Sequence, residues 1–201
     1  VLIHTDDINT SLCSSLDTTG TRRATSTENH IRAFANELLG GGAFLSSRIP
    51  QRLRENEGMS YGAGTFMNSN YRYDVSSWGI YAMFNPLYKG RLDSALHQEV
   101  DKALKGGFTK DELDKSKNAW LEGNKTTLGM NDFLARQLRW YMRDERDLAD
   151  FTDFENKIKS LSLEAVNAAL RKYFDKSKLV MVYSGDFEKG KTDKPAEKKG
   201  F

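Results

Sequence analysis

The sequence predicts an α+β fold: a mainly antiparallel sheet with helices packed on one face. Strand-like segments lie at the start, middle and end of the chain, and long amphipathic helical segments separate them. Two glycine-punctuated strand segments follow one another across a short polar bend, which is typical of an antiparallel pair. The 201 residues, with 38% hydrophobic and 29% charged, are enough to bury one core.

The first half of the chain is expected to hold a strand, two helices and the strand pair. An opening strand is expected within residues 1–26, and a Thr25-x-x-Glu28 capping box opens the first helix. This helix is expected to stop at Gly40–Gly42, because glycine adopts the left-handed cap conformation without steric cost. The remaining elements are a short helix over 46–56 and strands over 59–68 and 78–84.

The second half is expected to be mainly helical. Asn85-Pro86 supplies an N-cap and a first-turn proline for a helix that stops at 106–107. A second capping box, Thr109-x-x-Glu112, opens the next helix. The remaining elements are helices over 131–143, 150–160 and 162–174 and a last strand over 178–184.

One domain is expected over residues 1–186, followed by a lysine-rich, disordered tail over 187–201. A net charge of +2 is too small to indicate a nucleic-acid partner, and no segment approaches the roughly 18 apolar residues of a membrane span. The single cysteine, Cys13, excludes an intrachain disulfide and is expected to be a buried structural thiol. The chain begins without Met or a signal-peptide pattern, so we interpret it as a piece of a longer protein whose compartment stays open.

No metal site is expected in this chain. Its histidines, His4, His30 and His97, are too far apart for a helical or hairpin zinc pair, and neither H-E-x-x-H nor H-x-x-E-H occurs. The triple glycine at 40–42 lacks the Gly-Lys-Ser/Thr of a phosphate-binding loop, so a helix stop is the favoured interpretation.

The segment 53–62 supports two interpretations. Residues 58–62 match G-x-S-x-G, the nucleophile elbow of serine hydrolases. That elbow needs a strand before the serine and a helix after it, and the expected order here is reversed, so a serine hydrolase using Ser60 is a remote alternative. The second interpretation is a functional pair, Arg54 and Tyr61, on either side of a helix-to-strand turn. Arginine offers a fixed fork of donors and tyrosine can donate to an oxyanion, although spacing alone also allows two residues without function.

Residues 27–186 resemble the non-metal, C-terminal half of the insulinase/pitrilysin zinc metallopeptidases, the inverzincins. The motifs that carry the resemblance are L-G-G-G at 39–42, S-S-R at 46–48, L-R-x-x-x-G-x-x-Y at 53–61 and F-T-x-x-E-L at 108–113. The resemblance implies a metallopeptidase-half fold like that of mitochondrial processing peptidase. In such enzymes the metal half carries H-x-x-E-H and zinc, and the other half supplies an arginine and a tyrosine, which match Arg54 and Tyr61.

The resemblance implies that this half closes a chamber and assists peptide hydrolysis at a zinc held elsewhere. Tyr61 would donate to the oxyanion and Arg54 would hold a substrate carbonyl, while the peptide lies as an added strand on a sheet edge. The metal-binding half would lie upstream in the same protein or on a partner subunit, so this chain alone is expected to be inactive. A non-catalytic structural or peptide-binding subunit is the alternative, which retention of the pair disfavours. A periplasmic or otherwise exported location is consistent with the resemblance.

Overall fold

The structure, a computed structural model, describes residues 2–4, 10–19, 27–42, 47–69, 75–143 and 149–187. Its sheet has five strands in the order β1-β5-β2-β4-β3. All neighbouring strands are antiparallel except β1 and β5, which are parallel. The strands are β1 (Leu2–His4), β2 (Thr10–Thr19), β3 (Ser60–Ser69), β4 (Val75–Phe84) and β5 (Val180–Gly185).

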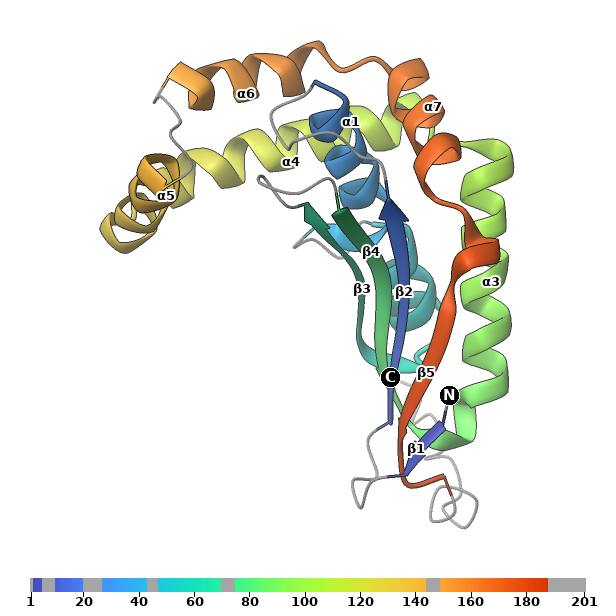
Figure 1. The fold of residues 1–201 in the computed structure, drawn as a ribbon. Helices are drawn as coiled ribbons and strands as arrows, with labels where there is room; N and C mark the ends of the chain where they lie inside the picture. Colours follow the sequence, from blue (N-terminus) through green and yellow to red (C-terminus); the bar gives the residue numbers. More distant parts are fainter. Residues whose placement is uncertain are drawn as a thin grey trace, which may run out of the picture.

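Helices cover one face of the sheet and extend past one of its ends (Figure 1). The predicted α+β class and mainly antiparallel sheet are therefore confirmed. The helices of the first half are α1 (Thr27–Asn36), η1 (Glu37–Gly41), α2 (Arg48–Pro50) and η2 (Gln51–Asn56). Those of the second half are η3 (Pro86–Tyr88), α3 (Lys89–Gly106), α4 (Lys110–Leu128), α5 (Asn131–Arg143), α6 (Ala149–Ser160), α7 (Leu163–Tyr173) and η4 (Lys176–Lys178).

Most predicted boundaries are confirmed, and the differences have physical reasons. The opening region holds two strands, and β2 continues to Thr19 despite its polar sequence because each residue pairs with β4 as far as Val75. The last strand begins at Val180 because the preceding residues form a 3-10 turn, which the carboxylate of Asp175 caps. The predicted cap at Thr25 and the tail from residue 188 lie outside the described residues, as does the side chain of Cys13.

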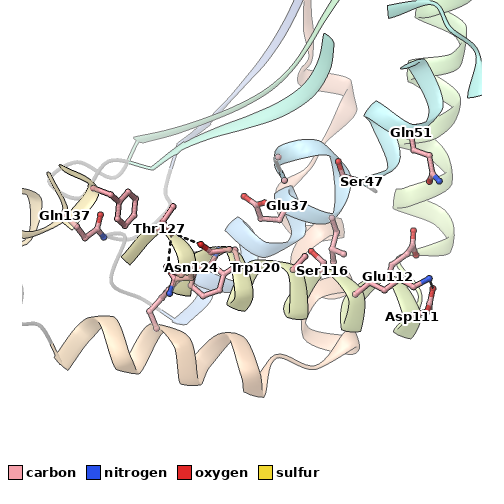
Figure 2. Close-up of a pocket in the computed structure, with 18 of the residues that line it drawn as sticks. Glu37, Ser47, Gln51, Asp111, Glu112, Ser116, Trp120, Asn124, Thr127 and Gln137 are labelled. Atoms are coloured by element: carbon pink, nitrogen blue, oxygen red, sulfur yellow. Dashed lines mark hydrogen bonds and ion pairs between the residues drawn. The ribbon is translucent and has the colours of Figure 1, made fainter. Parts of the chain in front are cut away.

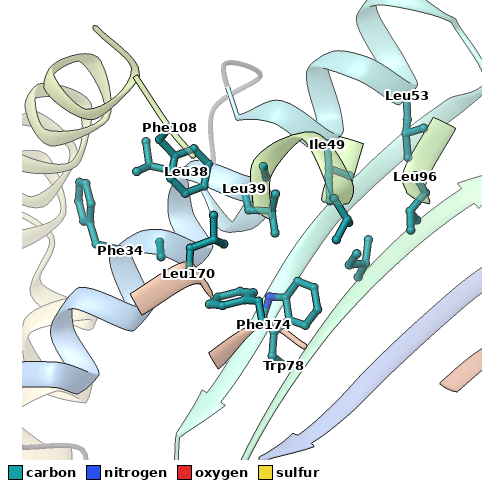
Figure 3. Packing of buried hydrophobic residues seen from close by; sticks show 14 of the residues in the cluster. Phe34, Leu38, Leu39, Ile49, Leu53, Trp78, Leu96, Phe108, Leu170 and Phe174 are labelled. Carbon is teal, nitrogen blue, oxygen red and sulfur yellow. The ribbon is translucent and has the colours of Figure 1, made fainter. Parts of the chain in front are cut away.

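The core lies between the helical layer and the covered face of the sheet (Figure 3). Along β4, Trp78, Ile80, Ala82 and Phe84 are buried, whereas Tyr81 between them is 41% exposed. This alternation is the two-residue period of a strand with one covered face. The helices contribute large buried side chains that include Phe34, Leu39, Leu96, Leu170 and Phe174.

A buried amide, Asn36, joins the first helix to the sheet. Its Oδ1 accepts a hydrogen bond from Nε1 of Trp78 at 3.0 Å, and its main-chain oxygen accepts one from Oγ1 of Thr65 at 3.1 Å. A Cβ on Gly41 would lie 2.2 Å from Nδ2 of Asn36. The helix stops where predicted, but not through a left-handed cap, because φ is 176° at Gly40 and −67° at Gly42. Close packing against Asn36 is the reason for a glycine at position 41.

Replacing Asn36 with alanine should lower the free energy of unfolding by roughly 1–3 kcal/mol, because the buried indole N–H of Trp78 would lose its acceptor. Urea denaturation followed by circular dichroism measures this change. In a double-mutant cycle with Trp78→Phe, the second substitution should cost less than it does alone. A loss below roughly 0.5 kcal/mol, or strictly additive losses, would show that this hydrogen bond contributes little.

Candidate functional site

The turn between η2 and β3 carries the two residues that the sequence singles out. Arg54 lies near the end of η2, and its carbonyl accepts a hydrogen bond from the N–H of Gly58 at 3.1 Å. The N–H of Met59 donates to the carbonyl of Leu53 at 2.9 Å. Gly58 has a φ of +61°, a conformation that glycine adopts without strain. The chain therefore leaves the helix in a defined direction before β3 begins.

Tyr61 is the extra residue of a β-bulge at the start of β3, which is an edge strand of the sheet. Ser60 pairs with Phe84 and Gly62 pairs with the adjacent Met83, so Tyr61 has no partner of its own on β4. Such bulges change the direction in which a side chain points. The Tyr61 side chain is 58% exposed, and its hydroxyl lies 3.3 Å from Sδ of Met83.

Ser60 stabilises this bulge through its hydroxyl. The side chain is buried, and Oγ lies 2.7 Å from the main-chain oxygen of Met83 and 2.8 Å from that of Gly62. Oγ of Ser60 also accepts a hydrogen bond from the N–H of Gly62 at 3.2 Å. A helix precedes Ser60 and a strand follows it, the reverse of a nucleophile elbow. The geometry thus gives Ser60 a structural role beside Tyr61 and no support as a nucleophile.

Arg54 and Tyr61 are both accessible, but they do not contact one another. The side chain of Arg54 is 49% exposed, and its Nε lies 3.4 Å from Oε1 of the neighbouring Glu55. In the described part of the chain, no hydrogen bond joins Arg54 to Tyr61. The structure therefore confirms that both residues flank one helix-to-strand turn.

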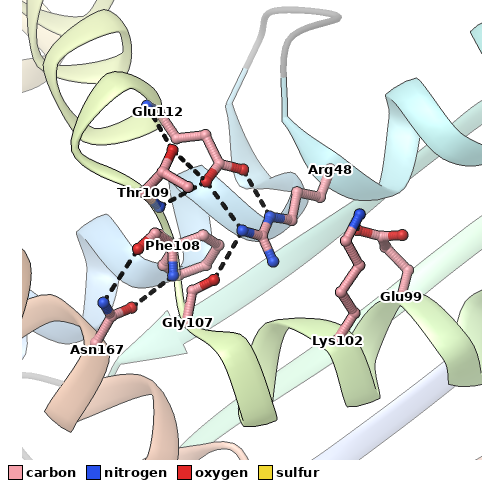
Figure 4. A network of polar contacts seen from close by, with 8 residues as sticks. All are labelled: Arg48, Glu99, Lys102, Gly107, Phe108, Thr109, Glu112 and Asn167. Atoms are coloured by element: carbon pink, nitrogen blue, oxygen red, sulfur yellow. Dashed lines mark hydrogen bonds and ion pairs between the residues drawn. The ribbon is translucent and has the colours of Figure 1, made fainter.

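A partly buried ion pair anchors the segment that carries Arg54 and Tyr61 (Figure 4). Arg48 donates from Nε to Oε1 of Glu112 at 2.6 Å and from Nη2 to Oε2 at 2.9 Å. Its Nη2 also donates to the carbonyl of Gly107 at 2.8 Å. Arg48 is part of the S-S-R motif, but that motif alone does not predict a role for it. Its partner is visible in the sequence only as the last residue of the second capping box.

Glu112 serves the ion pair and the helix cap at once. Its Oε2 accepts the N–H of Thr109 at 2.7 Å, and both halves of the capping box are formed. Burial works to raise the pKa of Glu112, but the hydrogen bonds from Arg48 and Thr109 outweigh it and lower the pKa from 4.5 to about 2. The carboxylate therefore stays charged in the folded protein.

The described residues contain no cluster of three or more His, Cys, Asp or Glu side chains that could hold a metal ion. The side chains of two of the three histidines are described: His30 packs edge-on against Phe154 with ring centroids 4.6 Å apart, and His97 is partly exposed on α3. Within the same residues, none of the helices has the length and apolar character needed to cross a membrane.

Residues 24–120 match the family model described as the peptidase M16 inactive domain. These residues carry the inactive domain of the M16 peptidases. M16 is the insulinase/pitrilysin family, so the resemblance to its non-metal half is confirmed. The matched range contains Arg48, Arg54 and Tyr61.

Two of the many solved structures that share the fold match this chain over most of its length. One is the M16 inactive domain from Pseudomonas fluorescens, with a TM-score of 0.77 and 23% identity over 92% of this chain and 43% of that chain. The other was assigned as a zinc protease from Bordetella pertussis Tohama I, with a TM-score of 0.67 and 16% identity over 87% of this chain and 93% of that chain. Both likenesses lie below 25% identity and therefore show the fold alone.

A curated relative, Tubulin glycylase 3E of Tetrahymena thermophila, is 23% identical over 159 residues. The match covers 75% of this chain and 11% of that protein. The chain therefore spans about a tenth of this relative and less than half of the Pseudomonas chain.

Replacing Glu112 with glutamine should lower the free energy of unfolding at pH 7 by roughly 1–2 kcal/mol. This figure is smaller than the pKa shift alone implies, because the Glu112 side chain is partly exposed and solvent screens its charge. Because folding lowers the pKa of Glu112 to about 2, its contribution is present above pH 4.5 and is lost as the pH falls toward 2. Urea denaturation across this range should show the two proteins converging at the acid end.

The exposed Glu122, which pairs with Lys125 on α4, provides the matched control, since Glu122→Gln should change stability little at any pH. A deficit of Glu112→Gln that stays constant from pH 7 to the acid limit would contradict an ionic contribution.

Proposed function

We propose that this chain is the non-metal half of a zinc metallopeptidase and contributes Arg54 and Tyr61 to peptide hydrolysis at a zinc on the other half. The observation that carries the proposal is the bulge, which holds the exposed Tyr61 at the edge of the sheet, seven residues after the exposed Arg54. Membership of the M16 inactive-domain family supports it.

Tyr61 is suited to donate a hydrogen bond from its hydroxyl group to a developing oxyanion. Its present acceptor is the thioether of Met83, a weak acceptor that a negatively charged oxygen would readily replace. The zinc, when bound on the other half, would polarise the scissile carbonyl and activate a water molecule. Tyr61 would donate a hydrogen bond to the same oxygen.

Arg54 is suited to hold a substrate carbonyl. Its ion pair with Glu55 is long and exposed, and surface pairs of this kind contribute about 0–1 kcal/mol. The guanidinium can therefore leave that pair at little cost and donate to a peptide oxygen with its fixed fork. Because β3 is an edge strand, a peptide lying along a neighbouring sheet edge could pass both side chains.

The partner in this proposal is a metal-binding half. The chain spans 43% of the Pseudomonas chain, which leaves room for a second half of similar size. That half would lie in the same protein or on a separate subunit and carry H-x-x-E-H. The absence of H-x-x-E-H from both the full-length protein and every protein that co-purifies with it would exclude the peptidase role.

A non-catalytic subunit that binds or scaffolds peptides is the second candidate. The observation that favours it is the match to a segment of Tubulin glycylase 3E, a protein whose name states a different activity. Under this alternative, Tyr61 and Arg54 would contribute to binding at most, and no variant of them would change a rate of hydrolysis.

In the assembled two-half enzyme, Tyr61→Phe should lower kcat by roughly 10²-fold with little change in KM, because one oxyanion donor is lost. A fluorogenic peptide assay measures both constants. Tyr81→Phe is the matched control, since Tyr81 is also an exposed tyrosine of this sheet but pairs with Gly64, beyond the bulge, and the kcat of this variant should be unchanged. An unchanged kcat in Tyr61→Phe would leave Tyr61 without a catalytic role.

A further inference from the structure

A cavity of about 730 Å³ lies between η1 on one side and α4, α5 and α6 on the other (Figure 2). This volume is in the range of pockets that bind small ligands or side chains. Four aromatic side chains line it, from α4, α5 and α6: Trp120, Phe133, Tyr141 and Phe154. Trp120 and Phe154 contact each other edge to face, with ring centroids 5.1 Å apart. The cavity is thus a partly apolar space with aromatic walls.

The charges on the cavity wall are paired, with one exception. Nζ of Lys115 lies 2.7 Å from Oδ2 of Asp111, and Glu112 is held by Arg48. Glu37, the first residue of η1, also lines the cavity. Among the described residues that line it, Glu37 is the charged side chain whose carboxylate has no hydrogen bond or ion pair. The cavity wall therefore carries one carboxyl group that has no ionic partner.

The state of Glu37 is unfavourable for the free protein. It is half-buried, and burial raises the pKa of its carboxyl group because the charged form loses solvation. A buried charge without a partner destabilises a fold, so packing alone does not account for a carboxylate here. A cation that enters the cavity would supply the missing partner. If this cation is the end of a long side chain, the aromatic rings would cover the aliphatic part of that side chain and attract its charge.

We propose that this cavity binds an arginine or lysine side chain of a peptide, with Glu37 as its ionic partner and Trp120 and Phe154 as its apolar walls. A metal ion does not fit, because one free carboxylate is too few ligands. The cavity also reaches the segment of Arg54, since Ser47 and Gln51 line its other end. The inference rests on the proposed function in one respect, which is that the ligand is a peptide. The cavity would then select peptides that contain a basic residue.

Direct binding tests this inference without reference to turnover. A fluorescein-labelled, alanine-rich peptide with one arginine is titrated with the intact protein, and its counterpart with citrulline keeps the shape but removes the charge. Fluorescence anisotropy should show the arginine peptide binding about 10-fold more tightly, the scale of one charge-assisted hydrogen bond. Glu37→Gln should abolish this difference and leave the affinity for the citrulline peptide unchanged.

Two controls make the outcome unambiguous. Glu122→Gln removes an exposed carboxylate of α4 that does not line the cavity, and it should keep the preference for arginine. Folding raises the pKa of Glu37, so the ionised carboxylate destabilises the folded state once the pH is well above that pKa. At pH 8, the melting temperature of Glu37→Gln should therefore be higher than that of the wild-type protein. That rise shows that the variant is folded.

Equal affinity of the wild-type protein for both peptides, no binding of either, or an arginine preference that survives in Glu37→Gln would each overturn the proposal. These outcomes are independent of Tyr61→Phe, which tests hydrolysis. Equal affinity for both peptides together with an impaired Tyr61→Phe would leave the peptidase role intact and reject only this cavity as a specificity pocket.

Discussion

The ion pair between Arg48 and Glu112 is the interaction on which both proposed sites depend. It joins the short helix before Arg54 to the start of α4, and it also holds the carbonyl of Gly107 at the end of α3. Gly107 has a φ of +72°, and Asn167 of α7 bonds to both main-chain groups of the next residue, Phe108. Four helical segments therefore meet at one polar centre. Its position fixes the turn that carries Arg54 and one wall of the cavity beside Glu37.

The second constraint is the bulge in β3. A regular strand would pair every residue with β4 and point alternate side chains to the two faces of the sheet. One extra residue breaks this pattern and leaves Tyr61 without a cross-strand partner. The buried hydroxyl of Ser60 satisfies main-chain groups that the break would otherwise leave unpaired. The G-x-S-x-G match is thus a structural motif in this protein, and its serine supports the neighbouring tyrosine.

The sequence predicted most of the fold because periodicity and helix caps are local. The alternation of Trp78, Ile80, Ala82 and Phe84 along β4 and the box formed by Thr109 and Glu112 both appear in the structure as expected. The bulge could not be predicted, because an extra residue in a strand leaves no mark on a short glycine-rich segment.

The missed parts of the candidate sites have a similar cause. Arg48 and Glu112 are 64 residues apart, and only the folded chain shows that one carboxylate serves both a cap and an ion pair. Glu37 follows a helical pattern, and only its place beside helices from the second half of the chain reveals the cavity.

The central claim is that this half supplies groups that a zinc-bearing half needs for hydrolysis. The most direct measurement is the rate of peptide hydrolysis by the separated metal-binding half as this chain is added in increasing amounts. We predict a saturable increase in kcat, because oxyanion and carbonyl donors arrive with the added half. A metal-binding half that is fully active alone, with a kcat that does not respond to this chain, would contradict the claim.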